Sequence, residues 1–203
     1  MNSRNNLFFL VVFILSLFGL SSVIAEEVSP RSTVEILIKS ISSLETGIQL
    51  SPEEIKKNDL LSYNALDLLN IKEICRKALG KYWVKRSLTE QKVFVDLLSL
   101  MFIKEAFPNS GKFFSTLKLI YGQTSINKSK ANVPLSVVHD KEGEINIVFH
   151  LYKYSNQWQV VDVALDGISM RNNLRSKLYK IISKNNYQEL VRRLEQKLTE
   201  IKN

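Results

Sequence analysis

The chain has 203 residues, 45% of them hydrophobic, and carries 28 Lys and Arg against 20 Asp and Glu, a formal net charge of +8. This length is enough for one domain with a sizeable core, and a single cysteine, Cys75, excludes an internal disulfide. The excess of cations is compatible with anionic lipid head groups, a polyanion or an acidic protein partner, but does not choose among them.

The N-terminus has the three parts of a secretory signal peptide. Residues 2–6 are polar and include Arg4, residues 7–20 are almost wholly apolar, and residues 21–25 are mostly small. A membrane-spanning helix needs about 20 apolar residues, and this run is shorter, which favours a signal peptide over a membrane anchor. We therefore predict export, cleavage after Ala25, and a single mature domain over residues 26–203.

The first half of the mature chain is predicted to be helical. Ser29 precedes a proline at a predicted helix start, and Ser51 and Ser87 each begin a capping-box pattern. Apolar residues then recur at helical spacing, Gly80 is a predicted helix stop, and Pro108 is predicted to end the strongest helix. The predicted helices cover about residues 30–44, 52–69, 71–79, 88–107 and 111–120. Cys75 lies in the third of them and is predicted to be a small buried side chain.

The pattern then changes to strands and returns to helices. Four strands are predicted over residues 123–127, 134–140, 145–154 and 157–165. The connections at Lys141–Glu144 and Ser155-Asn156 are short, which favours antiparallel neighbours. Two helices follow Gly167, over about residues 170–183 and 187–201. The order predicts an α+β domain in which a four-stranded antiparallel sheet is flanked by about six or seven helices.

The last two predicted strands are apolar on both faces. In one, Ile145, Ile147, Phe149 and Leu151 alternate with Val148, His150, Tyr152 and Tyr154. In the other, Val161, Val163 and Leu165 alternate with Trp158, Val160 and Ala164. Such a sheet is not expected to leave one face fully in water. Helices could cover both faces as an ordinary core, or helices could cover one face while something apolar occupies a cleft against the other.

The sequence contains no recognisable catalytic motif. The two histidines, His139 and His150, lie in predicted strands, and zinc-protease, redox-cysteine, serine-hydrolase and phosphate-loop patterns are missing from the sequence. Asp162 and Asp166 could serve as acid and base, but Asp166-Gly167 fits a turn and Asp162 fits a structural carboxylate. Because Lys and Arg lie mostly on the polar faces of helices, nucleic-acid binding is not indicated. We predict a protein that is not an enzyme, with no catalytic residue, metal or cofactor.

Two segments carry a family resemblance. WQVVDVALDGISMRNNLRSKL contains Trp158, the pair Val161-Asp162 and Asp166–Ser169, and a final helix with leucines from Leu190 to Leu198 follows it. ICRKALGKYWVKRSLTEQKV contains the segment Ala78–Trp83. Together and in this order, the segments resemble the MlaC or toluene-tolerance family. Its members are periplasmic phospholipid-binding proteins of an ABC transport system that maintains outer-membrane lipid asymmetry.

The resemblance implies a periplasmic carrier that shuttles a phospholipid with two acyl chains between inner- and outer-membrane complexes. It implies transient contacts with an inner-membrane ABC transporter and an outer-membrane lipoprotein complex, and we expect a monomer. A related branch of the family is associated with hopanoids, so another lipid is an alternative cargo. Two further alternatives are an exported interaction protein with a filled core and a small hydrolase using His139, His150, Asp162 or Asp166.

A lipid carrier needs a cleft that removes acyl chains from water. Removing two tails of roughly 16 carbons each from water is worth a gross free energy on the order of 20 kcal/mol, at about 0.8 kcal/mol per CH₂. We therefore predict an apolar cleft between sheet and helices, with one sheet face packed on helices and the other facing the cargo. The strand before Asp166-Gly167 would form one wall, and Ser169 would cap the helix that follows. The predicted lining residues are Tyr82, Trp83, Phe102, Phe113, Tyr121, Val148, Tyr152, Val161 and Val163.

Overall fold

The computed structural model describes residues 28–47, 49–139 and 143–201. The predicted signal peptide, its cleavage after Ala25 and part of the predicted 141–144 connection lie outside these residues. The α-helices are α2 (Pro30–Ser42), α3 (Pro52–Asp67), α4 (Ile71–Leu79), α5 (Leu88–Met101), α6 (Phe107–Ser115), α7 (Met170–Lys184) and α8 (Tyr187–Ile201). A 3₁₀ turn, η1 (Gly80–Lys85), precedes α5, and a π turn, η2 (Phe102–Ala106), follows it. Across the described ranges, no helix is both long and apolar enough to cross a membrane.

The predicted helix starts are confirmed by their capping hydrogen bonds. The side-chain oxygens of Ser29, Ser51 and Ser87 each accept a hydrogen bond from a backbone N–H in the first turn. At Ser51 and Ser87 a glutamate three residues later returns the bond, which completes a capping box. Gly80 ends α4 with a φ of +50°, a backbone angle that side chains with a Cβ rarely adopt.

The helix boundaries around Pro108 differ from the prediction. Pro108 does not end a helix; it lies in the first turn of α6 and lacks the N–H that would bond to the preceding turn. The π turn η2 joins α5 to α6 directly, through the bond from the Phe107 N–H to the Phe102 carbonyl. The helix predicted over residues 111–120 therefore begins earlier and ends at Ser115. Ile120 belongs instead to a strand whose half-buried residues alternate with exposed ones.

The sheet has six strands rather than the predicted four, and all its pairs are antiparallel. The strands are β1 (Lys118–Tyr121), β2 (Ser125–Asn127), β3 (Lys130–His139), β4 (Gly143–Tyr154), β5 (Gln157–Leu165) and β6 (Ile168–Ser169). Their order is β1-β3-β4-β5-β6, with β2 also paired to β3. The predicted tight turn Ser155-Asn156 is confirmed: both residues have positive φ, as a two-residue hairpin connection requires. The α+β class is thus confirmed, and the sheet is larger than expected.

A β-bulge in β5 changes which side chains share a face. Leu151 pairs with Val160 and His150 pairs with Asp162, so Val161 is an extra residue in β5. Beyond the bulge, Val163 pairs with Phe149. Strict alternation would place Val163 and Val160 on opposite faces of the sheet, but the bulge puts both side chains on the same face.

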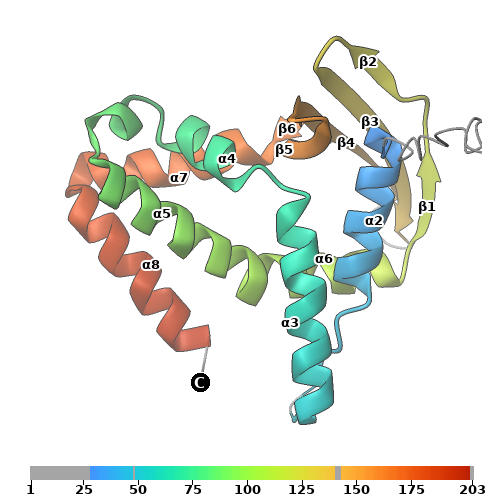
Figure 1. Ribbon diagram of the computed structural model, residues 1–203, viewed down its shortest axis with the longest axis horizontal. Helices are drawn as coiled ribbons and strands as arrows, with labels where there is room; N and C mark the ends of the chain where they lie inside the picture. The colour runs from blue at the N-terminus through green and yellow to red at the C-terminus, as the bar shows by residue number, and fades with distance from the viewer. Residues whose placement is uncertain (1–27, 48, 140–142, 202–203) are drawn as a thin grey trace, which may run out of the picture.

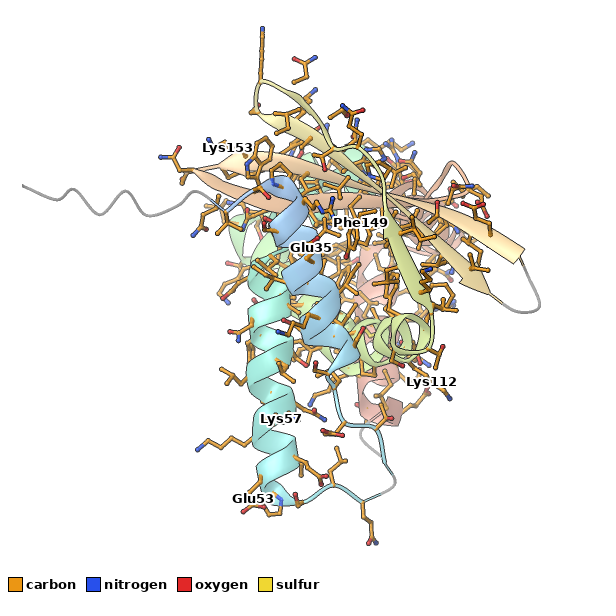
Figure 2. All side chains as sticks on the ribbon, turned by 90° about the vertical axis from the view of Figure 1, so that its right-hand side faces the viewer. Glu35, Glu53, Lys57, Lys112, Phe149 and Lys153 are labelled. Carbon is orange, nitrogen blue, oxygen red and sulfur yellow. The ribbon has the colours of Figure 1, made fainter. Side chains whose placement is uncertain are left out.

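That face, called here the inner face, packs against the helices. Its buried side chains include Val133, Leu135, Ile147, Phe149, Leu151 and Val160. Helix α2 packs across β3 and β5, close to Phe149 in Figure 2, while α3 lies beside α2 and extends away from the sheet. Helices α4, α5, α7 and α8 lie together on the far side of the molecule from β1 and β3 (Figure 1).

The opposite, outer face is more polar than predicted. His150 Nδ1 lies 2.7 Å from Asn132 Oδ1, and Ser136 Oγ lies 3.4 Å from Asn146 Oδ1, so polar side chains pair across neighbouring strands. Between them lie partly exposed apolar groups such as Val148. The apolar pattern predicted for residues 145–154 and 157–165 thus does not extend over the whole outer face, because Asn132 and Ser136 of β3 pair there with His150 and Asn146 of β4.

Candidate functional site

An apolar cavity of about 460 Å³ lies between the inner face of the sheet and the helices. This volume falls within the roughly 300–1,000 Å³ of typical small-molecule sites. The cavity is lined by Leu37 and Ile41 of α2, Leu69, Phe102 and Ala106 of η2, Phe107, Asn109, Ser110, Phe113 and Phe114 of α6, Phe149, Val163 and Leu165 of the sheet, and Met170 of α7. None of these side chains carries a charge.

The wall of the cavity is only partly buried. Leu37, Phe107 and Phe149 are buried, whereas Phe113 and Val163 retain partial exposure. A filled core would bury such side chains against one another, since large apolar groups are the most fully buried in ordinary interiors. The cavity is thus an opening in the core, with a buried floor and a half-exposed rim.

A second apolar hollow of about 200 Å³ adjoins the cavity. Leu69, Phe102, Val163 and Met170 line both spaces. The second hollow continues along β5 past Val161 toward the first turn of α7. The two spaces together form a continuous apolar lining from α6 to the start of α7.

Four of the nine predicted lining residues line these two spaces. Phe102, Phe113 and Val163 line the cavity, and Val161 lines the adjoining hollow. The other lining residues include Leu37 and Ile41, which belong to the apolar residues at helical spacing in the helix predicted over residues 30–44, and Phe149, which lies on one apolar face of a predicted strand. The cavity opens on the sheet face that packs on helices. Its lining residues therefore show the same helical or alternating pattern of apolar residues as the core.

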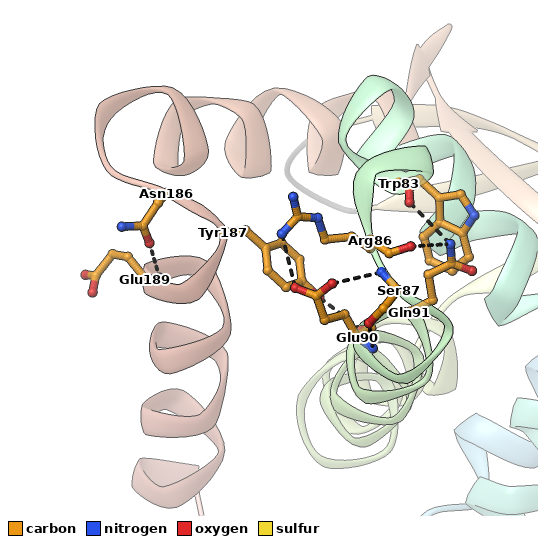
Figure 3. A network of polar contacts seen from close by, with 8 residues as sticks. All are labelled: Trp83, Arg86, Ser87, Glu90, Gln91, Asn186, Tyr187 and Glu189. Carbon is orange, nitrogen blue, oxygen red and sulfur yellow. Dashed lines mark hydrogen bonds and ion pairs between the residues drawn. The ribbon is translucent and has the colours of Figure 1, made fainter.

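Tyr82 and Trp83 lie elsewhere, in η1. The Tyr82 ring packs edge-on against Tyr179 of α7, with 4.9 Å between ring centroids. Trp83 is buried, and its carbonyl accepts a hydrogen bond from Gln91 Nε2 at 3.3 Å (Figure 3). Both aromatics therefore hold η1 against α5 and α7 instead of lining the cavity.

Tyr121, Val148 and Tyr152 also lie away from the cavity. Tyr121 is in β1, with the Arg31 guanidinium 4.9 Å from its ring centroid, and burial raises its pKa. Val148 alternates with Phe149 and thus belongs to the outer face. Tyr152 also lies on the outer side, beneath the ammonium group of Lys130 at 5.4 Å. These three residues were predicted on the assumption that the cargo meets the face opposite the helices. Because the cavity lies on the inner face of the sheet, they do not line it.

Asp162 and Ser169 fix the connection from β5 to α7. Asp162 accepts hydrogen bonds from Ser169 Oγ at 2.6 Å and from the backbone N–H groups of Val163 and Arg171 at 2.9 and 3.0 Å. Ser169 caps α7 by accepting a bond from the Asn172 N–H at 3.0 Å. The predicted structural role of Asp162 and the predicted cap at Ser169 are confirmed, and together they place Met170 at the cavity.

Ser169→Ala is expected to lower the free energy of unfolding by about 2 kcal/mol, because the variant loses a helix cap and one of the donors to a buried carboxylate. Urea unfolding of the two proteins measures the difference. Ser176→Ala, on an exposed turn of the same helix, is the control and should change stability by less than about 0.5 kcal/mol. Equal losses for the two variants would contradict the role given to Ser169.

A polar network joins α5 to α8 (Figure 3). The Tyr187 hydroxyl donates to the Glu90 carbonyl at 3.0 Å. Arg86 bonds the Glu90 carboxylate at 3.1 Å and lies 4.7 Å from the Tyr187 ring centroid. Burial, and to a lesser extent the nearby Glu90 carboxylate, raise the pKa of Tyr187 to about 12. The network therefore favours a protonated phenol in the folded protein.

Between about pH 10 and pH 12 we expect Tyr187 to make the protein less stable as pH rises. The phenol ionises near pH 10 in the unfolded chain but only near pH 12 in the folded protein, so the folded state binds the extra proton in this window. Tyr187→Phe should remove this part of the pH dependence and cost about 1 kcal/mol at neutral pH for the lost hydrogen bond. Urea midpoints measured from pH 8 to pH 12 test both, and an identical slope in the two proteins would refute the assignment.

The residues considered for chemistry have structural partners. His150 pairs with Asn132, and Asp162 is engaged by Ser169 and backbone N–H groups. Burial raises the pKa of the Cys75 thiol, which disfavours the reactive thiolate. Within the part of the chain that the structure describes, no group of three or more His, Cys, Asp or Glu side chains could hold a metal ion. The structure does not describe the side chain of His139.

Comparisons with known proteins agree with the fold. The family model described as "MlaC protein" matches residues 32–196. A phospholipid-binding protein from Ralstonia solanacearum, solved in complex with a phospholipid, superposes with a TM-score of 0.68 at 15% sequence identity, over 88% of this chain and 100% of that one. No curated protein matches the chain in sequence.

Proposed function

Because the chain belongs to the MlaC family, we propose that it is a periplasmic carrier whose cavity holds the acyl chains of a phospholipid. One observation carries the proposal: the space between sheet and helices has an apolar, uncharged lining with a half-exposed rim. The similar fold of a protein solved with a bound phospholipid supports the same cargo. The alternative of an exported protein with a filled core does not account for this opening.

The chemistry of the cavity suits a carrier rather than an enzyme. Acyl chains need only removal from water, at about 0.8 kcal/mol for each buried CH₂, and aromatic and aliphatic walls provide it. The MlaC family consists of lipid-binding carriers, and release to a membrane requires no bond to break. The carrier therefore works by binding and exchange, with no catalytic residue, metal or cofactor assigned to it.

The path of the carrier follows from the same family. We propose that residues 1–25 direct export to the periplasm, and that the mature domain acts there as a monomer. Transient contacts with an inner-membrane ABC transporter and with an outer-membrane lipoprotein complex would allow the lipid to be exchanged at each end. The result would be maintenance of outer-membrane lipid asymmetry.

A transfer assay tests the proposal. Mature protein freed of lipid is incubated with donor vesicles containing a labelled diacyl phospholipid and with unlabelled acceptor vesicles. The protein should accelerate transfer of the label in proportion to its concentration and should bind about one lipid per chain at saturation. A folded protein that leaves the transfer rate at the protein-free value, and that takes up no label, would overturn the carrier function.

A further inference from the structure

The positive charge of the chain is concentrated in two segments. Residues 71–85, which form α4 and η1, contain five Lys or Arg and one acid, Glu73, and residues 170–184, which form α7, contain five Lys or Arg and no acid. The two segments together carry a net charge of +9, whereas the whole chain carries +8 and its other residues, with 18 cations and 19 acids, carry −1. The excess of cations therefore belongs to α4, η1 and α7.

These segments are far apart in the chain but lie side by side in the fold. Helix α4 packs along α7 (Figure 1), and the Tyr179 hydroxyl of α7 accepts a hydrogen bond from the Lys81 N–H at 3.1 Å. The Arg175 guanidinium lies 5.0 Å from the centroid of the Tyr179 ring and donates from Nη2 to its hydroxyl at 3.2 Å. The Lys and Arg side chains of residues 71–85 and 170–184 thus share one surface, called here the basic surface.

Most cations of the basic surface have no acid beside them. Arg76 pairs with Glu73 and Arg171 pairs with Asp162. The other eight have no carboxylate within ion-pair distance among the residues that the structure describes, and all eight are exposed. Seven of them are lysines, whose ammonium groups are hydrated point charges on flexible stems. The surface is therefore suited to negative charge that is spread over an area, rather than to one precisely placed group.

Two exposed apolar side chains lie at one end of the basic surface. Val84 of η1 and Leu88, the first residue of α5, are 80% and 84% exposed, more than any other large apolar side chain that the structure describes. The exposed Lys85 lies between them in the chain. Attraction of cations to anionic head groups and burial of a few apolar side chains are the two contributions that attach proteins to a membrane surface. The basic surface offers both.

We propose that the basic surface docks the protein on a membrane surface that contains anionic phospholipids. Lysine is depleted from protein–protein interfaces, so a surface whose cations are mostly lysines fits lipid head groups better than an acidic protein. The head groups would face the lysines of α4, η1 and α7, while Val84 and Leu88 would enter the outermost apolar layer. Ile74 of α4 and Leu174 of α7 also line the apolar hollow beside the cavity, so docking here would hold the lipid-binding spaces close to the membrane.

Sedimentation of the mature protein with vesicles tests the docking. Vesicles of phosphatidylcholine and phosphatidylglycerol in equal amounts are expected to bind at least about tenfold more tightly than vesicles of phosphatidylcholine alone. The triple variant Lys77→Gln, Lys85→Gln and Lys180→Gln, with one change in each of α4, η1 and α7, should bind the anionic vesicles at least about tenfold more weakly than wild type.

Two control variants separate the basic surface from general charge and general hydrophobicity. Lys56→Gln, Lys112→Gln and Lys128→Gln together remove three exposed lysines elsewhere on the molecule and should leave the affinity within about threefold of wild type, because charges beyond about 8 Å are screened at physiological salt. Val84→Ser with Leu88→Ser should weaken binding about fivefold. Leu60→Ser, at a 63% exposed position of α3, should leave it unchanged.

The outcomes decide between a membrane and another partner. Equal binding to the two kinds of vesicle, or equal losses in the two triple variants, would overturn the proposal. Poly-L-glutamate stands in for an acidic protein: if wild type binds it, the Lys77, Lys85 and Lys180 variant does not, and neither binds anionic vesicles, the surface takes an acidic chain and the membrane assignment is overturned. The docking goes beyond the carrier function, because a protein that docks as expected but takes up no phospholipid fails only as a carrier.

Discussion

Val163→Trp is expected to lower the amount of bound phospholipid at least about tenfold while the protein remains folded. Val163 projects from β5 into the cavity beside Phe149, and an indole in its place would occupy space that the acyl chains need. The half-exposed position of Val163 allows the larger ring to fit with a modest stability loss, roughly 1–3 kcal/mol. Native mass spectrometry after incubation with vesicles measures the bound lipid.

Val148→Trp is the matched control for this change. Val148 is a half-exposed valine on the neighbouring strand, and because it alternates with Phe149 its side chain belongs to the outer face. The same substitution there should leave lipid binding within about twofold of wild type. A loss of binding in the Val148 variant with none in the Val163 variant would place the cargo on the outer face and refute the cavity.

Gly111→Ala is expected to lower the free energy of unfolding by about 3 kcal/mol. A Cβ at this position would lie 2.0 Å from the Ile41 carbonyl oxygen of α2, and backbone cannot move aside as a flexible side chain can. Alanine is normally better than glycine inside a helix by about 1 kcal/mol, so a net loss measures the overpacking directly. Urea unfolding of lipid-free protein is the appropriate measurement.

The effect should extend to the cavity, because α2 and α6 both line it. Pushing the two helices apart would alter the spacing of Ile41 and Phe113 and weaken lipid binding. Gly47→Ala is the control: its added Cβ would meet Leu50 at an ordinary 3.5 Å, so stability and binding should change little. Stability unchanged in the Gly111 variant would mean that α2 and α6 do not pack as closely as described.

Local signals predicted the helices well. Ser29, Ser51, Ser87 and Ser169 each begin a helix in the structure, because a capping side chain and the first turn lie within a few residues of one another. The two-residue turn at Ser155-Asn156 was recognisable for the same reason. Features that depend on neighbouring residues in the chain are thus readable from sequence.

The features that position the cavity depend on distant parts of the chain. The bulge at Val161 exists only in the pairing with β4, so alternation alone placed Val163 and Val160 on opposite faces of the sheet. The π turn Phe102–Ala106 has no local sequence mark, and it carries the helix through the region where Pro108 was expected to end it. For the same reason Val148 and Val163 were both predicted to line the cleft, whereas the two side chains lie on opposite faces.

The central claim is that the cavity between sheet and helices holds the tails of a phospholipid. The most direct measurement is native mass spectrometry of the mature protein purified from the periplasm without detergent, followed by extraction and identification of the bound lipid. The account predicts about one diacyl phospholipid per folded chain, released when Val163 is replaced by tryptophan. A folded chain that carries no lipid, and that takes none from phospholipid vesicles, would contradict it.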